Sequence, residues 1–341
     1  MMQLQSKRLT SRWKRWAAAV SLVYAILGTG ELSRAQEKAS DLEALQIRPN
    51  FYMIAGAGGN IGLQFGADGS ILVDAGAKVY ADRVLTAIQK LTNEPIRYII
   101  NTSADVEHIG GNARLSRAGR NILATGPEPI GGDATRAMTN DLAATIYATE
   151  PTLLRLSTPP EKPPFPSDTW PTETFTEKRR TLFFNHDGLE VLRQPAAHSD
   201  GDAIVFFRAS DVIAAGDIID TLHFPTIELA NGGSIQGEIE ALNKIVEMAI
   251  RPLPFVFSEG GTIVIPGHGR LMDHADSVEY RDMVVIVRDT VADMMKRGMT
   301  LEQIKAASPA KQYEPRYGAK SGPWTTNDFI QAIYRSLQAK K

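Results

Sequence analysis

Apolar residues along this chain fall into two patterns: short runs bounded by turn residues, and longer stretches with helical spacing. The short runs predict strands at residues 51–54, 61–65, 70–74, 96–100, 121–124, 181–184, 189–194, 203–207, 211–215 and 262–265. Helical spacing predicts helices over residues 81–91, 234–250, 275–297, 301–307 and 326–338. Strands and helices are interleaved along the chain, which indicates an α/β fold.

The segments between these elements are less regular. Two Asp-Gly pairs between apolar runs, Asp68-Gly69 and Asp187-Gly188, predict β-hairpins. Residues 36–50 and 138–148 are helix-compatible. Residues 158–171 hold six prolines, which cannot continue a helix or a central strand. We interpret this Pro-rich stretch either as a lid over a site or as a surface excursion.

Side chains that can bind a metal ion or transfer a proton recur directly after the predicted strands. Strand 96–100 leads into residues 101–112, which contain Asp105, Glu107 and His108 before a Gly-Gly pair. Three further candidates follow other strands beside glycines: His198, Asp217 and His268. Groups at the ends of several strands of one sheet system converge in space, so the pattern predicts a metal or acid–base site.

Each candidate has a plainer interpretation when taken alone. A single histidine after a strand is usually exposed or hydrogen-bonded, and Asp217 could serve as a turn or helix cap. Asp105 and Glu107 could form a solvated loop face. His223, before Phe224, lies near the predicted site and is a weak candidate for substrate contact. Three histidines in the same setting favour a shared site.

Charge and cysteine content exclude several classes of function. The 341 residues carry a formal net charge of −2, which argues against nucleic-acid binding. The chain has no cysteine, which excludes disulfides, thiolate zinc sites and a cysteine nucleophile.

The N-terminus has the pattern of an export signal. Basic residues between Lys7 and Arg15 precede an apolar run at 17–27, and Ser33-Arg34-Ala35 offers a cleavage site. The alternative is an uncleaved anchor, but a bilayer span needs about 20 apolar residues. We therefore expect a signal peptide at 1–35 and a single domain at 36–341. The mature protein should be periplasmic or secreted, free of the membrane after signal cleavage, and should act on a small molecule.

The order of these segments resembles the metallo-β-lactamase superfamily. The resemblance runs through almost the whole mature chain and is carried by Gly58-Gly59-Asn60, Val73-Asp74-Ala75-Gly76, Glu107-His108-Ile109-Gly110-Gly111-Asn112, His198-Ser199-Asp200-Gly201, Gly216-Asp217 and Pro266-Gly267-His268-Gly269. It implies a four-layer αββα sandwich with the site at one edge. An insertion at about 150–175 and C-terminal helices from about 275 would be added to that fold.

The first motif departs from the family pattern His-x-His-x-Asp-His. Ser103 and Asp105 stand where the two leading histidines would be, and Glu107 stands where the aspartate would be. His108 matches the last position of the motif. By the same resemblance, the later ligands are His198, His268 and a bridging carboxylate, Asp217.

The resemblance implies two unequal metal positions. One keeps Glu107, His108, His268 and Asp217, a set adequate for a divalent ion. The other keeps His198, Asp217 and Asp105, with Ser103 a poor neutral ligand. We expect one or two zinc ions, and manganese or iron could replace zinc at the carboxylate-rich position.

The implied activity is hydrolysis by metal-activated water. Asp105 or Glu107, when not a ligand, would orient or deprotonate that water. The substrate would be a small ester, lactone, thioester or β-lactam-like molecule, a choice favoured slightly by Phe165 and Trp170 in the insertion. The alternative is a catalytically silent ligand- or partner-binding protein that has lost part of the dinuclear site. Residues 314–341, with Trp324, Phe329 and Tyr334, are interpreted as a helix that closes the core.

Overall fold

The computed structural model describes residues 42–122, 143–158, 165–252 and 260–339, and one compact unit spans Glu43–Lys341. The predicted signal peptide and strand residues 123–124 lie outside the described residues, as do 138–142 of the helix-compatible segment and 159–164 of the Pro-rich stretch. Within the described ranges, no helix has the length and apolar character needed to cross a membrane.

Two β-sheets form the centre of this unit. The first has seven strands in the order β1 (Glu43–Arg48), β2 (Phe51–Ala57), β3 (Gly59–Gly66), β4 (Gly69–Val73), β5 (Ile96–Ile100), β6 (Thr145–Thr149) and β7 (Glu173–Phe175). The second has five strands in the order β12 (Ile263–His268), β11 (Val212–Asp220), β10 (Asp202–Phe207), β9 (Asp187–Gln194) and β8 (Arg179–Phe184). Each sheet mixes antiparallel hairpins with parallel pairs such as β4–β5 and β11–β12.

The inner faces of the two sheets share one apolar core. Phe51 and Ile71 of the first sheet belong to the same buried cluster as Val205, Phe207 and Ile265 of the second. Phe51 and Phe207 meet edge to face, with ring centroids 4.7 Å apart. The sheets therefore pack face to face, as alternating inward side chains of a sandwich do.

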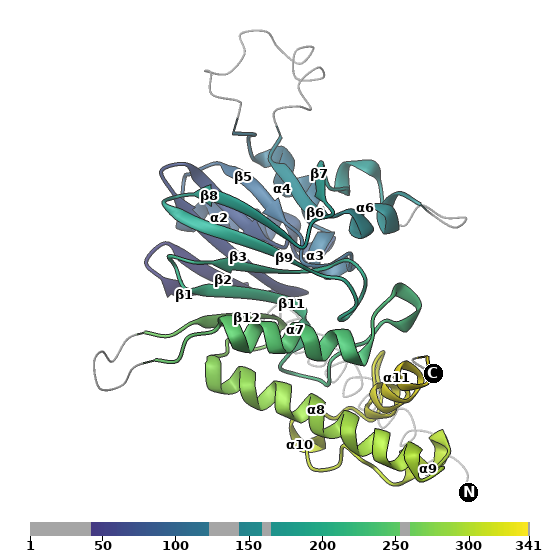
Figure 1. Cartoon of the computed structure of the whole chain (residues 1–341). Helices are drawn as coiled ribbons and strands as arrows, with labels where there is room; N and C mark the ends of the chain where they lie inside the picture. The colour runs from purple at the N-terminus through teal and green to yellow at the C-terminus, as the bar shows by residue number, and fades with distance from the viewer. Residues whose placement is uncertain (1–41, 123–142, 159–164, 253–259, 340–341) are drawn as a thin grey trace, which may run out of the picture. The chain divides into compact units, whose positions relative to one another are not determined.

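Helices cover the outer faces. They are α2 (Ala81–Leu91), α3 (Val106–Ile109), α4 (Asn112–Ala118), α6 (Glu150–Ser157), α7 (Ile235–Met248), α8 (His274–Lys296), α9 (Leu301–Ala306), α10 (Glu314–Tyr317) and α11 (Thr326–Gln338). Helices α7, α8 and α11 belong to one buried cluster with side chains of the second sheet, and Figure 1 shows α7 beside β11 and β12 with α8 next to α7. Helices α2 and α4 contact β2 and β5 of the first sheet. The predicted αββα sandwich is confirmed.

Two segments expected to be helix-compatible are strands, so those predictions were wrong. Residues 43–48 form β1, an exposed edge strand that pairs antiparallel with β2. Residues 145–149 form β6, which is buried along its length between the parallel strands β5 and β7. In both cases pairing with a neighbour outweighs local propensity, and a fully exposed or fully buried strand shows no alternation of polar and apolar positions.

The hairpin predicted at Asp187-Gly188 turns two residues earlier. Phe184 pairs with Asp187, and the turn residues are Asn185 and His186, both with positive φ of 52° and 60°. Two such residues in a row make a type I′ turn, which suits the twist of a hairpin. The other hairpin turns at Ala67 and Asp68, and Gly66 pairs with Gly69.

The expected insertion at about 150–175 contains regular structure. It includes α6, a short 3-10 helix at Ser167–Thr169 and strand β7 at the edge of the first sheet. Phe165 and Trp170 pack on a small cluster of Ala104, Ile109 and Leu156. The described part of this segment therefore braces the loop that follows β5.

Candidate metal centre

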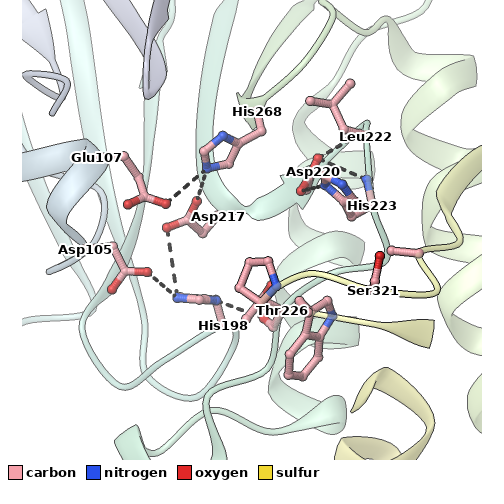
Figure 2. Close-up of a pocket in the computed structure, with 13 residues that line it drawn as sticks. Asp105, Glu107, His198, Asp217, Asp220, Leu222, His223, Thr226, His268 and Ser321 are labelled. Carbon is pink, nitrogen blue, oxygen red and sulfur yellow. Dashed lines mark hydrogen bonds and ion pairs between the residues drawn. The ribbon is translucent and has the colours of Figure 1, made fainter. Parts of the chain in front are cut away.

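The site lies where several strands end at one edge of the two sheets. The loop and short helix after β5 supply Asp105, Glu107 and His108, and the β9–β10 loop supplies His198. Asp217 lies on β11, where the pairing with β12 is irregular, and His268 ends β12. Figure 2 shows Asp105, Glu107, His198, Asp217 and His268 converging on a cavity of about 380 Å³.

His108 lies beneath the cavity and is held on both ring nitrogens. Its Nδ1 is 2.8 Å from Asp74 Oδ2, and its Nε2 is 2.8 Å from Asp217 Oδ1. Asp74 also accepts hydrogen bonds from the Thr102 amide at 2.8 Å and the Thr102 hydroxyl at 2.7 Å. A carboxylate behind Nδ1 fixes the ring orientation and leaves Nε2 as the donor atom for an ion.

Asp217 divides its two oxygens between two groups of side chains. Oδ1 is 2.8 Å from His108 Nε2 and 3.4 Å from His268 Nε2. Oδ2 is 3.1 Å from the Ser103 hydroxyl and 3.9 Å from His198 Nε2. This arrangement is that of a carboxylate able to bridge two cations.

The first group is His108, Asp217 and His268, whose ligand atoms lie within 4.8 Å of one another. Glu107 borders it, with Oε1 3.6 Å from His268 Nε2. Two imidazoles and two carboxylates form a donor set that suits zinc and other divalent first-row ions.

The second group is Asp105, His198 and Glu228, again with ligand atoms within 4.8 Å. Asp105 Oδ2 is 3.1 Å from His198 Nε2, and Glu228 Oε2 is 3.9 Å from it. His198 Nδ1 donates to the Thr226 carbonyl at 2.8 Å, so Nε2 faces the carboxylates. Oxygen ligands outnumber nitrogen in this group, which favours a harder ion than the first group does.

Close backbone approach explains the glycines around the site. A Cβ at Gly267 would lie 2.7 Å from Asp217 Oδ1, and one at Gly111 would lie 2.2 Å from the Ala75 carbonyl oxygen. Gly111 lets the turn after His108 pack against the end of β4, and Gly267 makes room for the Asp217 carboxylate.

Burial and charge shift the pKa values of His108, His198 and Asp217. Burial alone would lower the pKa of His108, but Asp217 and Asp74 outweigh it and hold that pKa well above its usual value. His198 behaves in the same way, because Asp105, Asp217 and Asp202 oppose the effect of burial on its pKa. The pKa of Asp217 is held well below its usual value by His108, His268 and His198, despite burial.

Two buried carboxyl groups lie deeper. Burial raises the pKa of Asp202 to about 7, while the Ser199 amide and hydroxyl donate to it at 2.7 Å each. Burial also raises the pKa of Glu238 well above its usual value, and its carboxyl oxygens have no partner among the described residues. A carboxyl group without a partner is far less costly to bury when protonated.

The structure places all six residues that the sequence predicted at one centre. Ser103 also lies there, but its hydroxyl bonds to Asp217 and does not belong to either group of ligand atoms. Two contributors were missed. Asp74 was noted only as part of a motif and was given no role. Glu228 stands in no motif. It reaches the site because its amide donates a hydrogen bond of 2.8 Å to the His198 carbonyl.

A second wall completes the cavity. It comes from the segment after β11, with Asp220, Leu222 and His223, and from the loop before α11, with Ser321 and Trp324. The interpretation of the C-terminal segment as purely core-closing was therefore incomplete. Phe329 does close the core, whereas Trp324 packs on the core and also lines the cavity.

Comparison with known proteins identifies the family and the fold. The family model described as the metallo-beta-lactamase superfamily matches residues 55–268. No curated protein matches the chain in sequence. The chain is structurally similar to the sec-alkylsulfatase Pisa1 from Pseudomonas sp., with a TM-score of 0.56 and 12% identity over 86% of this chain and 50% of that one.

Two further solved structures show the same fold. A double mutant of PisA1 gives a TM-score of 0.60 and 12% identity over 87% of this chain and 50% of the mutant, so the chain spans about half the length of these alkylsulfatases. A metallo-beta-lactamase from Pontibacter korlensis gives a TM-score of 0.51 and 15% identity over 72% of this chain and 99% of that one.

Proposed function

The chain belongs to the metallo-β-lactamase superfamily, and on that premise we propose that it is a metal-dependent hydrolase. The observation that carries the proposal is the position of Asp217 between two groups of ligand-competent side chains. The departures from the family's first motif leave both groups with at least one imidazole and two carboxylates. Such donor sets fit one or two divalent ions.

The first group would hold zinc through His108, Asp217 and His268, with Glu107 beside them. The second would hold a weaker ion through Asp105, His198 and Glu228, where manganese or iron could replace zinc. An ion at this centre would supply Lewis acidity, which makes water a better nucleophile near neutral pH and polarises the oxygen of the scissile bond.

The protein's own groups have distinct tasks in that reaction. Asp74 and the Thr226 carbonyl orient His108 and His198. The side chains of Asp105 and Glu107 are 26% and 33% exposed and face the cavity, so either can accept a proton from water when it is not ligating. The buried core beneath His108 keeps water away from the rear of the centre.

The lining of the cavity favours a small ester, lactone, thioester or β-lactam-like substrate. None of the described residues that line it is Lys or Arg. The structurally similar sec-alkylsulfatase is named for sulfate esters. In this cavity a sulfate ester would meet no side-chain cation except a protonated histidine. The basic and apolar leader at 1–35 supports export, so we propose that the enzyme works in the periplasm or outside the cell.

The test is turnover of a panel of uncharged esters, lactones, thioesters and β-lactams by purified protein. Activity should disappear with a chelator and return with added zinc or manganese. Asp217→Ala and His198→Ala should abolish it while the far-ultraviolet spectrum stays that of a folded protein. A folded protein that binds ions but hydrolyses no member of the panel would favour the silent-scaffold alternative instead.

A further inference from the structure

The wall of the cavity opposite the metal-ligand candidates is built from two segments distant in sequence. Figure 2 shows Leu222, His223 and Ser321 across the cavity from Asp105 and Glu107. At about 380 Å³ the cavity is large enough for a small organic ligand, and the metal-ligand candidates occupy only one side of it.

This wall is preformed. The Phe224 amide donates to the Tyr317 carbonyl at 3.1 Å, and the Phe224 ring stacks on Phe329 with centroids 4.9 Å apart. The Thr326 amide donates to the Ala319 carbonyl at 3.0 Å, which ties the second segment to the start of α11. A wall anchored in the core costs little ordering entropy when a ligand binds.

One polar group on the wall is oriented and free to bond. Asp220 Oδ1 accepts the Leu222 and His223 amides at 2.7 and 3.2 Å, and Asp220 Oδ2 lies 3.0 Å from His223 Nδ1. No described residue bonds to His223 Nε2, and the side chain is 49% exposed. The ring is therefore fixed by its Nδ1 side and presents Nε2 for a ligand.

Apart from Asp220, His223 and Ser321, the wall is mostly apolar, and none of its described residues is Lys or Arg. Leu222, Pro323 and Trp324 supply its surface, and the Trp324 indole nitrogen is shielded without a hydrogen-bond partner among the described residues. Because that nitrogen is shielded, the part of the indole ring that can contact a ligand is apolar carbon. An anionic group here would meet only Asp220 and no Lys or Arg of the described lining.

We propose that this wall is a binding subsite for an uncharged, largely apolar group of the substrate. Trp324 is its contact surface and His223 its hydrogen-bonding residue. The inference rests on the proposed function, and it assigns substrate preference to residues 220–224 and 319–324.

The first test measures binding without turnover. Calorimetric titration of the purified full chain compares 6-phenylhexanamide with 6-phenylhexanoate, which have the same size and differ at one end in charge and in the amide N–H donors. Trp324→Ala and His223→Leu should each weaken amide binding by about fivefold, the loss of one aromatic or polar contact. Phe183→Ala, which truncates an aromatic side chain that is 76% exposed on β8, is the matched control and should change nothing.

Ser321→Lys gives an independent check that does not remove core packing. A cation on the wall should tighten binding of the carboxylate by about tenfold and leave the amide unchanged. The subsite is refuted if neither Trp324→Ala nor His223→Leu weakens binding of the amide. It is also refuted if Ser321→Lys leaves binding of the carboxylate unchanged. Absence of turnover would reject the hydrolase proposal alone, because these titrations need none.

Discussion

Replacing Asp74 with asparagine should weaken metal binding, although Asp74 is not itself a ligand candidate. Its carboxylate is 3% exposed and accepts three hydrogen bonds of 2.7–2.8 Å, two from Thr102 and one involving His108 Nδ1. An asparagine has one amide oxygen, so its nitrogen must face either the Thr102 amide or the pair formed by His108 Nδ1 and the Thr102 hydroxyl. If the amide nitrogen faces His108, the imidazole must accept at Nδ1 and carry its proton on Nε2, where the ion would bind.

The magnitudes follow from these contacts. Losing a hydrogen bond to a buried charged group costs about 1.5–3 kcal/mol of stability. Losing the group that orients a ligating histidine typically costs about 10–100-fold in metal affinity. The assay is zinc titration against a competing chelator, combined with urea unfolding of the same variant.

Asp187→Asn is the matched control. Asp187 is 2% exposed and accepts bonds from the Ala209 amide, the Ser210 amide and the Gln64 side chain at 2.7, 2.9 and 3.1 Å, away from the metal centre. The Asp187→Asn variant should lose about as much stability as Asp74→Asn does and should bind zinc as tightly as the wild type. If Asp74→Asn binds zinc within about twofold of the wild type, the assigned role of Asp74 is wrong.

Three further predictions concern single groups. Glu228→Gln should lower the number of bound ions from two to one, measured by elemental analysis after dialysis against micromolar zinc; an unchanged count would remove Glu228 from the second group. Zinc affinity should rise with pH from about 6 to 8, because the raised pKa values of His108 and His198 favour the protonated rings, with which an ion must compete; a flat profile in chelator competition would contradict this. Phe224→Ala should cost about 3–5 kcal/mol of unfolding free energy in urea, since the ring is 1% exposed and stacks on Phe329; a loss below about 1 kcal/mol would contradict the packing.

Local signals explain what the sequence could predict. Helix α11 was placed at its observed residues because its apolar spacing is regular, and in the structure Thr325 and Asp328 form a capping box at its start. The hairpin turn before Gly69 was found from an Asp-Gly pair. The six candidate site residues were chosen because each follows a predicted strand and stands in a segment that resembles the family.

Strand pairing and long-range contacts explain what was missed. Strand β6 is completely buried between strands far along the chain, whereas β1 is an exposed edge strand paired with the adjacent β2, and neither leaves a periodic pattern. Glu228 and Trp324 reach the cavity only because backbone bonds attach Glu228 to His198 and Phe224 to Tyr317. No spacing between residues encodes such contacts.

The most direct test of the account is the metal content of the purified chain, measured as ions per protein after equilibration with zinc and again with manganese. We expect at least one tightly held ion, a weaker second ion, and loss of both in Asp217→Ala, because that carboxylate belongs to the first group and its Oδ2 lies 3.9 Å from His198 Nε2 of the second. Folded wild-type protein that retains no divalent ion under these conditions would contradict it.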